Sequence, residues 1–115
     1  MATYSLDQLR ADVEKAYAGI TIEVGDDKIA LPNILRLSDS DRNKIVDHLE
    51  KLGEASEEND FTAIAKHSTA VLKIAAGKRG ADLVKLLGDD VALTLSVLRK
   101  WTEQTQAGEA DSSQS

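Results

Sequence analysis

The sequence has no cysteine and few aromatic residues: one tryptophan, two tyrosines and one phenylalanine among 115 residues. Without cysteine the chain forms no disulfide and offers no thiolate for catalysis or metal binding, which fits a reducing cytoplasm. No apolar run approaches the roughly 20 residues of a membrane-spanning helix, so we expect no membrane partner. With so few aromatic side chains, the core must be built from Leu, Ile, Val and Ala, which favours helices packed on helices.

The chain also has no excess of positive charge: its formal net charge is -6. The charge is uneven: residues 1–60 hold 14 acidic and 7 basic residues, whereas residues 61–88 hold 5 basic residues against Asp82 alone. An acidic chain repels the phosphates of nucleic acid at long range, so we expect no nucleic-acid partner. A chain of this length can form one domain that needs no metal or crosslink to fold.

The N-terminal third predicts a short helix followed by a β-hairpin. Ser5-Leu6-Asp7-Gln8 is a capping box, and the apolar residues after it have helical spacing, which predicts an amphipathic helix over 6–17. The apolar period then changes to two on either side of Gly25-Asp26-Asp27. This change predicts a hairpin over about 20–31, whose apolar face must lie on helices.

A second helix is predicted over 39–52. Ser38 and Ser40 compete as its N-cap, and Gly53 is a suitable residue to end it. The segment before it, residues 33–37, reads as a helical turn that directs its apolar side chains inward.

The remaining chain predicts three further helical segments and a tail. An acidic connector over 54–60 leads to a third long helix, then to a short segment over 82–87, then to a last helix capped by Asp89 or its neighbour. From residue 107 onward the chain is too polar to repay the entropy of ordering it. The predicted fold is mainly α, with a helical domain over 1–106, one N-terminal hairpin and a flexible polar tail over 107–115.

Neither histidine suggests catalysis or a metal centre. His48 and His67 are distant in the sequence, sit in no motif, and are interpreted as surface or boundary residues. The run Gly77-Lys78-Arg79-Gly80 has the composition of an anion site, but it lacks the Walker spacing and follows a helix, so it reads as an interhelical loop. We therefore expect no enzyme, no cofactor and no metal.

Two surfaces are candidates for contact with a partner protein. The first is the basic segment, defined as Lys66, Lys73, Lys78, Arg79 and Lys85, which either pairs with acids of the same domain or docks an acidic partner. The second is the face of the last helix that bears Leu93, Val97 and Trp101. Sequence leaves two roles open for Trp101, a core residue or a partner anchor.

Two strings carry a resemblance to a known family. The first is Lys15-Ala16-Tyr17-Ala18-Gly19-Ile20-Thr21-Ile22-Glu23-Val24-Gly25-Asp26, followed by Leu31-Pro32-Asn33-Ile34-Leu35-Arg36-Leu37. The second is Trp101-Thr102-Glu103-Gln104-Thr105-Gln106-Ala107-Gly108-Glu109-Ala110-Asp111-Ser112. In this order and at this length the chain resembles the tail assembly chaperones of long-tailed, siphovirus-type phages that infect actinobacteria.

The resemblance implies a function in tail morphogenesis. Such chaperones bind the tape measure protein, keep it soluble and recruit major tail tube protein subunits. They act in the host cytoplasm during infection and are absent from the mature virion. The family also produces a frameshifted longer form, with which the shorter form works, and a homo-oligomer remains open.

The alternative function is an acidic helical phage regulator that inhibits a host nucleic-acid-binding protein. Such a mimic of DNA needs carboxylates arrayed on one face and unmatched by bases. Seven basic residues are interleaved with the acids of residues 1–60, which weakens this alternative.

Overall fold

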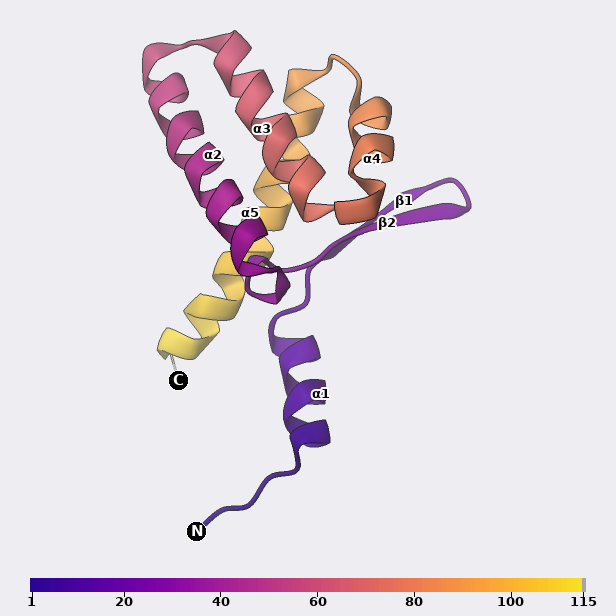
Figure 1. Ribbon diagram of the computed structural model, residues 1–115, viewed down its shortest axis with the longest axis vertical. Coiled ribbons are helices and arrows are strands. Elements are labelled where there is room, and N and C mark those ends of the chain that lie inside the picture. The colour runs from indigo at the N-terminus through magenta and orange to yellow at the C-terminus, as the bar shows by residue number, and fades with distance from the viewer. Residues whose placement is uncertain (115) are drawn as a thin grey trace.

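The computed structural model describes the backbone of residues 1–114 and the side chains of residues 1–104. Within this part of the chain it confirms a mainly helical fold with one antiparallel hairpin near the N-terminus (Figure 1). The predicted tail over 107–115 falls on residues whose side chains lie outside the described set, so it stays a prediction. The elements are α1 (Leu6–Ala16), β1 (Ile20–Val24), β2 (Asp27–Leu31), α2 (Asp39–Glu58), α3 (Phe61–Ala75), α4 (Gly80–Leu87) and α5 (Val91–Gln114), with short 3-10 turns η1 (Ile34–Arg36) and η2 (Gly77–Arg79).

Helix α1 begins as its sequence predicts. The backbone N–H of Gln8 donates to the Ser5 hydroxyl at 3.1 Å, and the Ser5 N–H donates to the Gln8 side chain at 3.3 Å. This reciprocal capping satisfies two backbone donors at the helix start. The helix extends away from the other helices along the long axis of the molecule (Figure 1).

The hairpin presents one apolar face to the core. Its strands pair in the register Ile22 to Ile29, and Gly25 supplies the positive φ of the turn. Ile29 and Leu31 are fully buried, as the alternating pattern predicts. A Cβ on Gly19 would overlap the carbonyl oxygen of Leu31, so only glycine lets the chain enter β1 at this distance from β2.

Helix α2 corrects one predicted boundary. Ser38, rather than Ser40, is the N-cap and accepts from the Asp41 N–H at 3.2 Å. The helix does not end at Gly53 but continues through most of the predicted connector to Glu58, where Asn59 caps it in the left-handed conformation at φ 55°. The prediction of a helix end at Gly53 was wrong, because Ala55 in the following turn is buried and extends the packed face.

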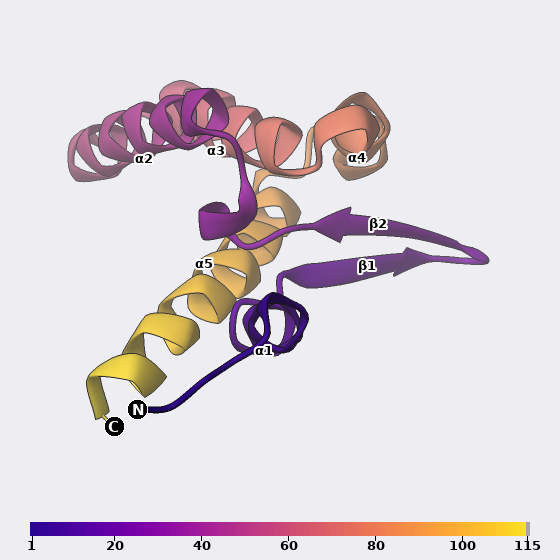
Figure 2. The same cartoon turned by 60° about the horizontal axis from the view of Figure 1, so that its bottom comes forward.

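One core joins the hairpin to the helices. Helices α2 and α3 pack side by side, α4 packs on α3, and α5 crosses beneath α3 (Figure 2). Trp101 of α5 lies in this core at 1% exposure, and its indole N–H donates to the Pro32 carbonyl oxygen at 2.8 Å. The cluster consists of Ile29, Leu31, Ile45, Val71, Leu72, Ala75, Ala76, Leu83, Leu87, Leu98 and Trp101.

Candidate interaction surfaces

The two histidines meet between α2 and α3. Their Nδ1 atoms lie 3.0 Å apart, and the ring centroids lie 5.2 Å apart. Both side chains are half-buried, which confirms their predicted boundary positions, although no sequence pattern indicated the contact between them. Burial and the neighbouring His48 hold the pKa of His67 below its usual value. Within the described residues no group of three or more His, Cys, Asp or Glu side chains is arranged to hold a metal ion.

The structure divides the predicted basic segment. Lys66 and Lys73 lie seven residues apart on α3, Lys78 lies in η2 and Lys85 on α4, and all four are exposed. Arg79 is different, because it is half-buried and makes ion pairs within the chain. The four lysines therefore remain accessible to a partner, whereas Arg79 has partners of its own.

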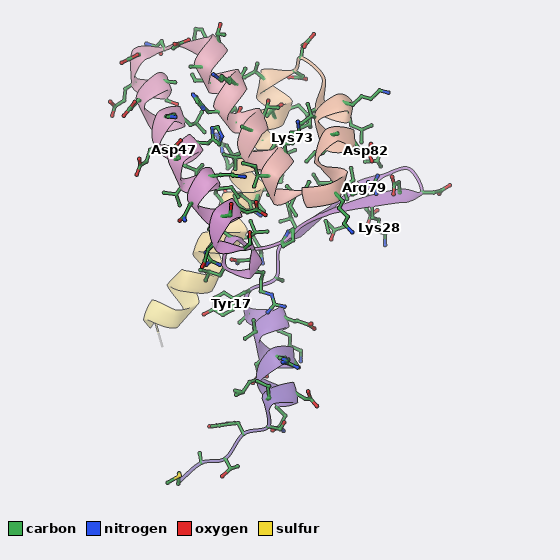
Figure 3. All side chains as sticks on the ribbon, in the orientation of Figure 1. Tyr17, Lys28, Asp47, Lys73, Arg79 and Asp82 are labelled. Atoms are coloured by element: carbon green, nitrogen blue, oxygen red, sulfur yellow. The ribbon has the colours of Figure 1, made fainter. Side chains whose placement is uncertain are left out.

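Arg79 ties the hairpin to the turn between α3 and α4 (Figure 3). Its Nη2 lies 2.6 Å from a carboxylate oxygen of Asp27 at the start of β2, and its Nε lies 2.9 Å from Asp82 on α4. Its Nη1 also donates to the Lys28 carbonyl oxygen at 3.3 Å. These contacts hold the pKa of Asp27 below its ordinary value and raise the pKa of Arg79. Arg79 is a structural residue that fixes the position of the hairpin.

The predicted partner face of α5 is not a single exposed face. Trp101 is in the core, which decides between its two predicted roles in favour of packing and corrects its assignment as a partner anchor. Val97 is half-buried and packs against the core cluster. Leu93, near the start of the helix, is 43% exposed. Only the N-terminal end of this face is free to contact another molecule.

A groove of about 530 Å³ opens between α3, the end of α4 and the start of α5. Lys66 lies in its wall, so one residue of the basic segment faces it. Phe61 and Leu93, which precede the lining residues Thr62 and Thr94 in the chain, are 72% and 43% exposed. The groove is lined by Thr62, Ala65, Lys66, Thr69, Val84, Gly88, Asp89, Val91 and Thr94.

Most of the groove residues were not predicted from the sequence. A faint signal was present, because Thr62, Ala65 and Thr69 follow one another at helical spacing and are all small. Small residues on one face of a helix permit close approach of another element, but the same pattern is common in ordinary helix packing. The other wall comes from the α4–α5 connection, and its position depends on the tertiary fold.

Nearly the whole chain matches a known protein family. A family model described as mycobacteriophage tail assembly protein matches residues 1–110. No match to a curated protein or to a solved structure was found. In the described residues, no helix combines the length and apolar character needed to cross a membrane.

Proposed function

The chain belongs to the mycobacteriophage tail assembly protein family, and we propose that within tail assembly it is a chaperone for the tape measure protein. In this proposal it binds that long helical chain, keeps it soluble and helps to recruit the major tail tube protein. The family membership agrees with the resemblance carried by the two ends of the sequence. It gives no support to the alternative of a regulator that inhibits a host nucleic-acid-binding protein.

The observations that carry the proposal are the open groove and the exposed side chains of Phe61 and Leu93, each of which precedes a groove-lining residue in the chain. A protein that keeps an apolar helix in solution needs accessible apolar surface of its own and enough charge to remain soluble. Phe61 and Leu93 supply such surface, and the net charge of -6 supplies solubility. Contact through a groove is a common mode of helix recognition.

The accessible residues of the two predicted surfaces complete the proposed contact. Lys66 in the groove wall is placed to pair with an acidic residue of the client, and Leu93 is placed to contact its apolar face. Lys73, Lys78 and Lys85 extend the positive charge along α3, η2 and α4. Val97, half-buried one turn further along the same helix, adds its exposed part to this contact. Contacts of this kind favour fast association and moderate affinity, which suits a client that must later be released.

The chaperone acts in the host cytoplasm during infection and leaves before the virion matures. It works with a frameshifted longer form of itself, and a homo-oligomer is compatible with this role. The two products would share the described domain, so both would carry the groove.

Co-expression with the tape measure protein of the same phage tests the function. The wild-type chain should raise the soluble fraction of the tape measure protein and should co-purify with it. Lys66→Glu and Leu93→Glu should each lower the co-purified amount about tenfold, the effect of losing one good contact of about 1.4 kcal/mol. Lys44→Glu is the matched control, because it reverses an exposed charge on α2. A tape measure protein that is equally insoluble with and without the chain would contradict the proposal.

A further inference from the structure

Helix α1 carries apolar side chains that the rest of the described chain does not cover. None of its residues is buried, and Leu6 and Leu9 are 60% and 43% exposed. Tyr4, just before the helix, is 66% exposed. Exposed apolar residues gathered on one element, rather than scattered singly, mark an interaction site.

The spacing of the apolar residues of α1 indicates which kind of element could pack against them. Leu6, Leu9, Val13 and Ala16 follow one another at intervals of three, four and three residues. This is the spacing of the a and d positions in a coiled coil, where one helix packs along another. We call these four residues the α1 stripe; Leu6, Leu9 and Ala16 are exposed, and Val13 is half-buried. A narrow straight stripe of this kind fits a second helix better than it fits a sheet or a small molecule.

Helix α1 has a complete N-terminal cap of its own. Its capping box satisfies backbone donors at the N-terminus without help from other elements. Eleven residues are nevertheless few for a helix with no buried residue, because isolated helices of fewer than about 12–15 residues are marginal in water. Docking of a partner helix on the α1 stripe would therefore stabilise α1 as well as cover it.

The charges beside the stripe argue against a second copy of the chain as this partner. Arg10 and Asp12 occupy the two flanks, at positions e and g of the heptad. In an antiparallel pair of α1 helices, position e faces position e and position g faces position g. Arg10 would then face Arg10 and Asp12 would face Asp12, so like charges would repel. In a parallel pair Arg10 faces Ser5 and Asp12 faces Tyr17, so no ion pair forms. The stripe is also only about three turns long, so two copies joined through it alone would bury far less than the roughly 800 Å² per partner of a stable dimer.

We propose that the α1 stripe is a second binding site for a helix of the tape measure protein, an inference that rests on the proposed function. The helix it fits has an apolar stripe of its own, with acidic residues on the flank that meets Arg10 and basic residues on the flank that meets Asp12. This site is separate from the groove, because α1 and the α4–α5 connection lie at opposite ends of the long axis (Figure 1).

Two weak sites on one chaperone suit a long client. The molecule extends 54 Å along its longest axis, which equals about 36 residues of α-helix at about 1.5 Å per residue. Once one site is bound, the other meets the same client at a high effective concentration, so the two contacts together exceed either one alone. Loss of either contact then lowers affinity enough for release.

Charge insertion on the full-length chain tests this site. Leu6→Glu and Leu9→Glu place a carboxylate in the α1 stripe, and Ala11→Glu places the same charge on the exposed opposite side of the same helix. Both stripe variants should bind the tape measure protein about tenfold or more weakly, the affinity gained from a second linked contact, whereas Ala11→Glu should bind like wild type. All three should keep the wild-type melting temperature, because the substituted side chains are exposed.

The outcomes separate this inference from the proposed function. If the wild-type chain binds the tape measure protein and the stripe variants bind equally well, the α1 site is wrong and the chaperone function stands. If the wild-type chain does not bind the tape measure protein, both proposals fail. Light scattering on the purified chain adds a check: a wild-type dimer that the stripe variants convert to monomer would assign the stripe to self-association and overturn its assignment to the client.

Discussion

The indole Nε1 of Trp101 donates a 2.8 Å hydrogen bond to the carbonyl oxygen of Pro32. Trp101 belongs to α5 and Pro32 follows β2, so the bond joins the last helix to the end of the hairpin. The tryptophan is also one of the core residues that pack around Ile29 and Leu31. Trp101 therefore holds the hairpin in place in two ways, by apolar packing and by a hydrogen bond.

Two substitutions of Trp101 should lower the free energy of unfolding by different amounts. Trp101→Phe keeps most of the apolar contact but leaves the Pro32 carbonyl oxygen without this donor, so we expect a loss of about 1–3 kcal/mol. Trp101→Ala also leaves a cavity and should cost about 3–5 kcal/mol. Urea unfolding followed by circular dichroism measures both. Leu93→Ala on the exposed end of the same helix is the control and should change stability by less than about 0.5 kcal/mol. Equal stability of Trp101→Ala and wild type would contradict this packing.

Removal of the Arg79 side chain should loosen the hairpin without unfolding the helices. Arg79→Ala eliminates the ion pairs with Asp27 and Asp82, so amide hydrogen exchange should become faster in β2 and remain unchanged in α3. Lys78→Ala, one residue earlier and exposed, should leave the exchange of β2 unaltered.

The same ion pair predicts an acid-sensitive hairpin. Because Arg79 lowers the pKa of Asp27 in the folded state, the stabilisation is present above the pKa of the unfolded chain and is lost as the pH falls through the lowered folded value. After correction for the intrinsic pH dependence of amide exchange, the loss of protection in β2 on acidification should therefore be smaller in Arg79→Ala than in the wild-type chain.

The histidine contact predicts a second, separate pH dependence. Burial, followed by the charges of His48, Lys66 and Lys51, lowers the pKa of His67. The unfolded chain then binds more protons than the folded chain, so stability should fall as the pH decreases through about 6.5. Melting temperatures between pH 8 and pH 5 should show this decrease, and His67→Gln should remove it. An NMR titration that places the pKa of His67 above the usual histidine value would refute the assignment.

Two glycines should respond in opposite directions to the same substitution. Gly53→Ala lies in the middle of α2, where a Cβ meets nothing within 4 Å, so alanine should raise the free energy of unfolding by about 0.5–1 kcal/mol. Gly19→Ala would force a Cβ onto the Leu31 carbonyl oxygen and should lower it by about 1–3 kcal/mol. Each variant is the control for the other, and chemical denaturation measures both.

The parts of the fold that could be predicted depend on local chemistry. The capping box at Ser5, the alternation around Gly25 and the N-cap at Ser38 each involve residues within a few positions, so the pattern alone contains the information. The helix end at Gly53 failed because burial of Ala55 outweighs the low helix propensity of one glycine.

The candidate site was less accessible to sequence reasoning because its contacts are not local. The pairing of Arg79 with Asp27 spans 52 positions, and the contact of His48 with His67 spans 19. Nothing in the neighbouring residues distinguishes Arg79, which is bound within the chain, from Lys78, which is exposed. The exposure of α1 is a further case, since an amphipathic pattern predicts an apolar face but does not tell what covers it.

The hairpin residues are synthesised long before the residues that shield them. A separation of 69 positions lies between Pro32 and Trp101, and a ribosome that adds roughly 5–20 residues per second needs roughly 3–14 seconds to cover it. An isolated two-stranded hairpin is marginally stable at best in water. Ile29 and Leu31 therefore lack the part of their cover that Trp101 supplies until the final helix has been synthesised, and the domain acquires its closed core only as its last third emerges.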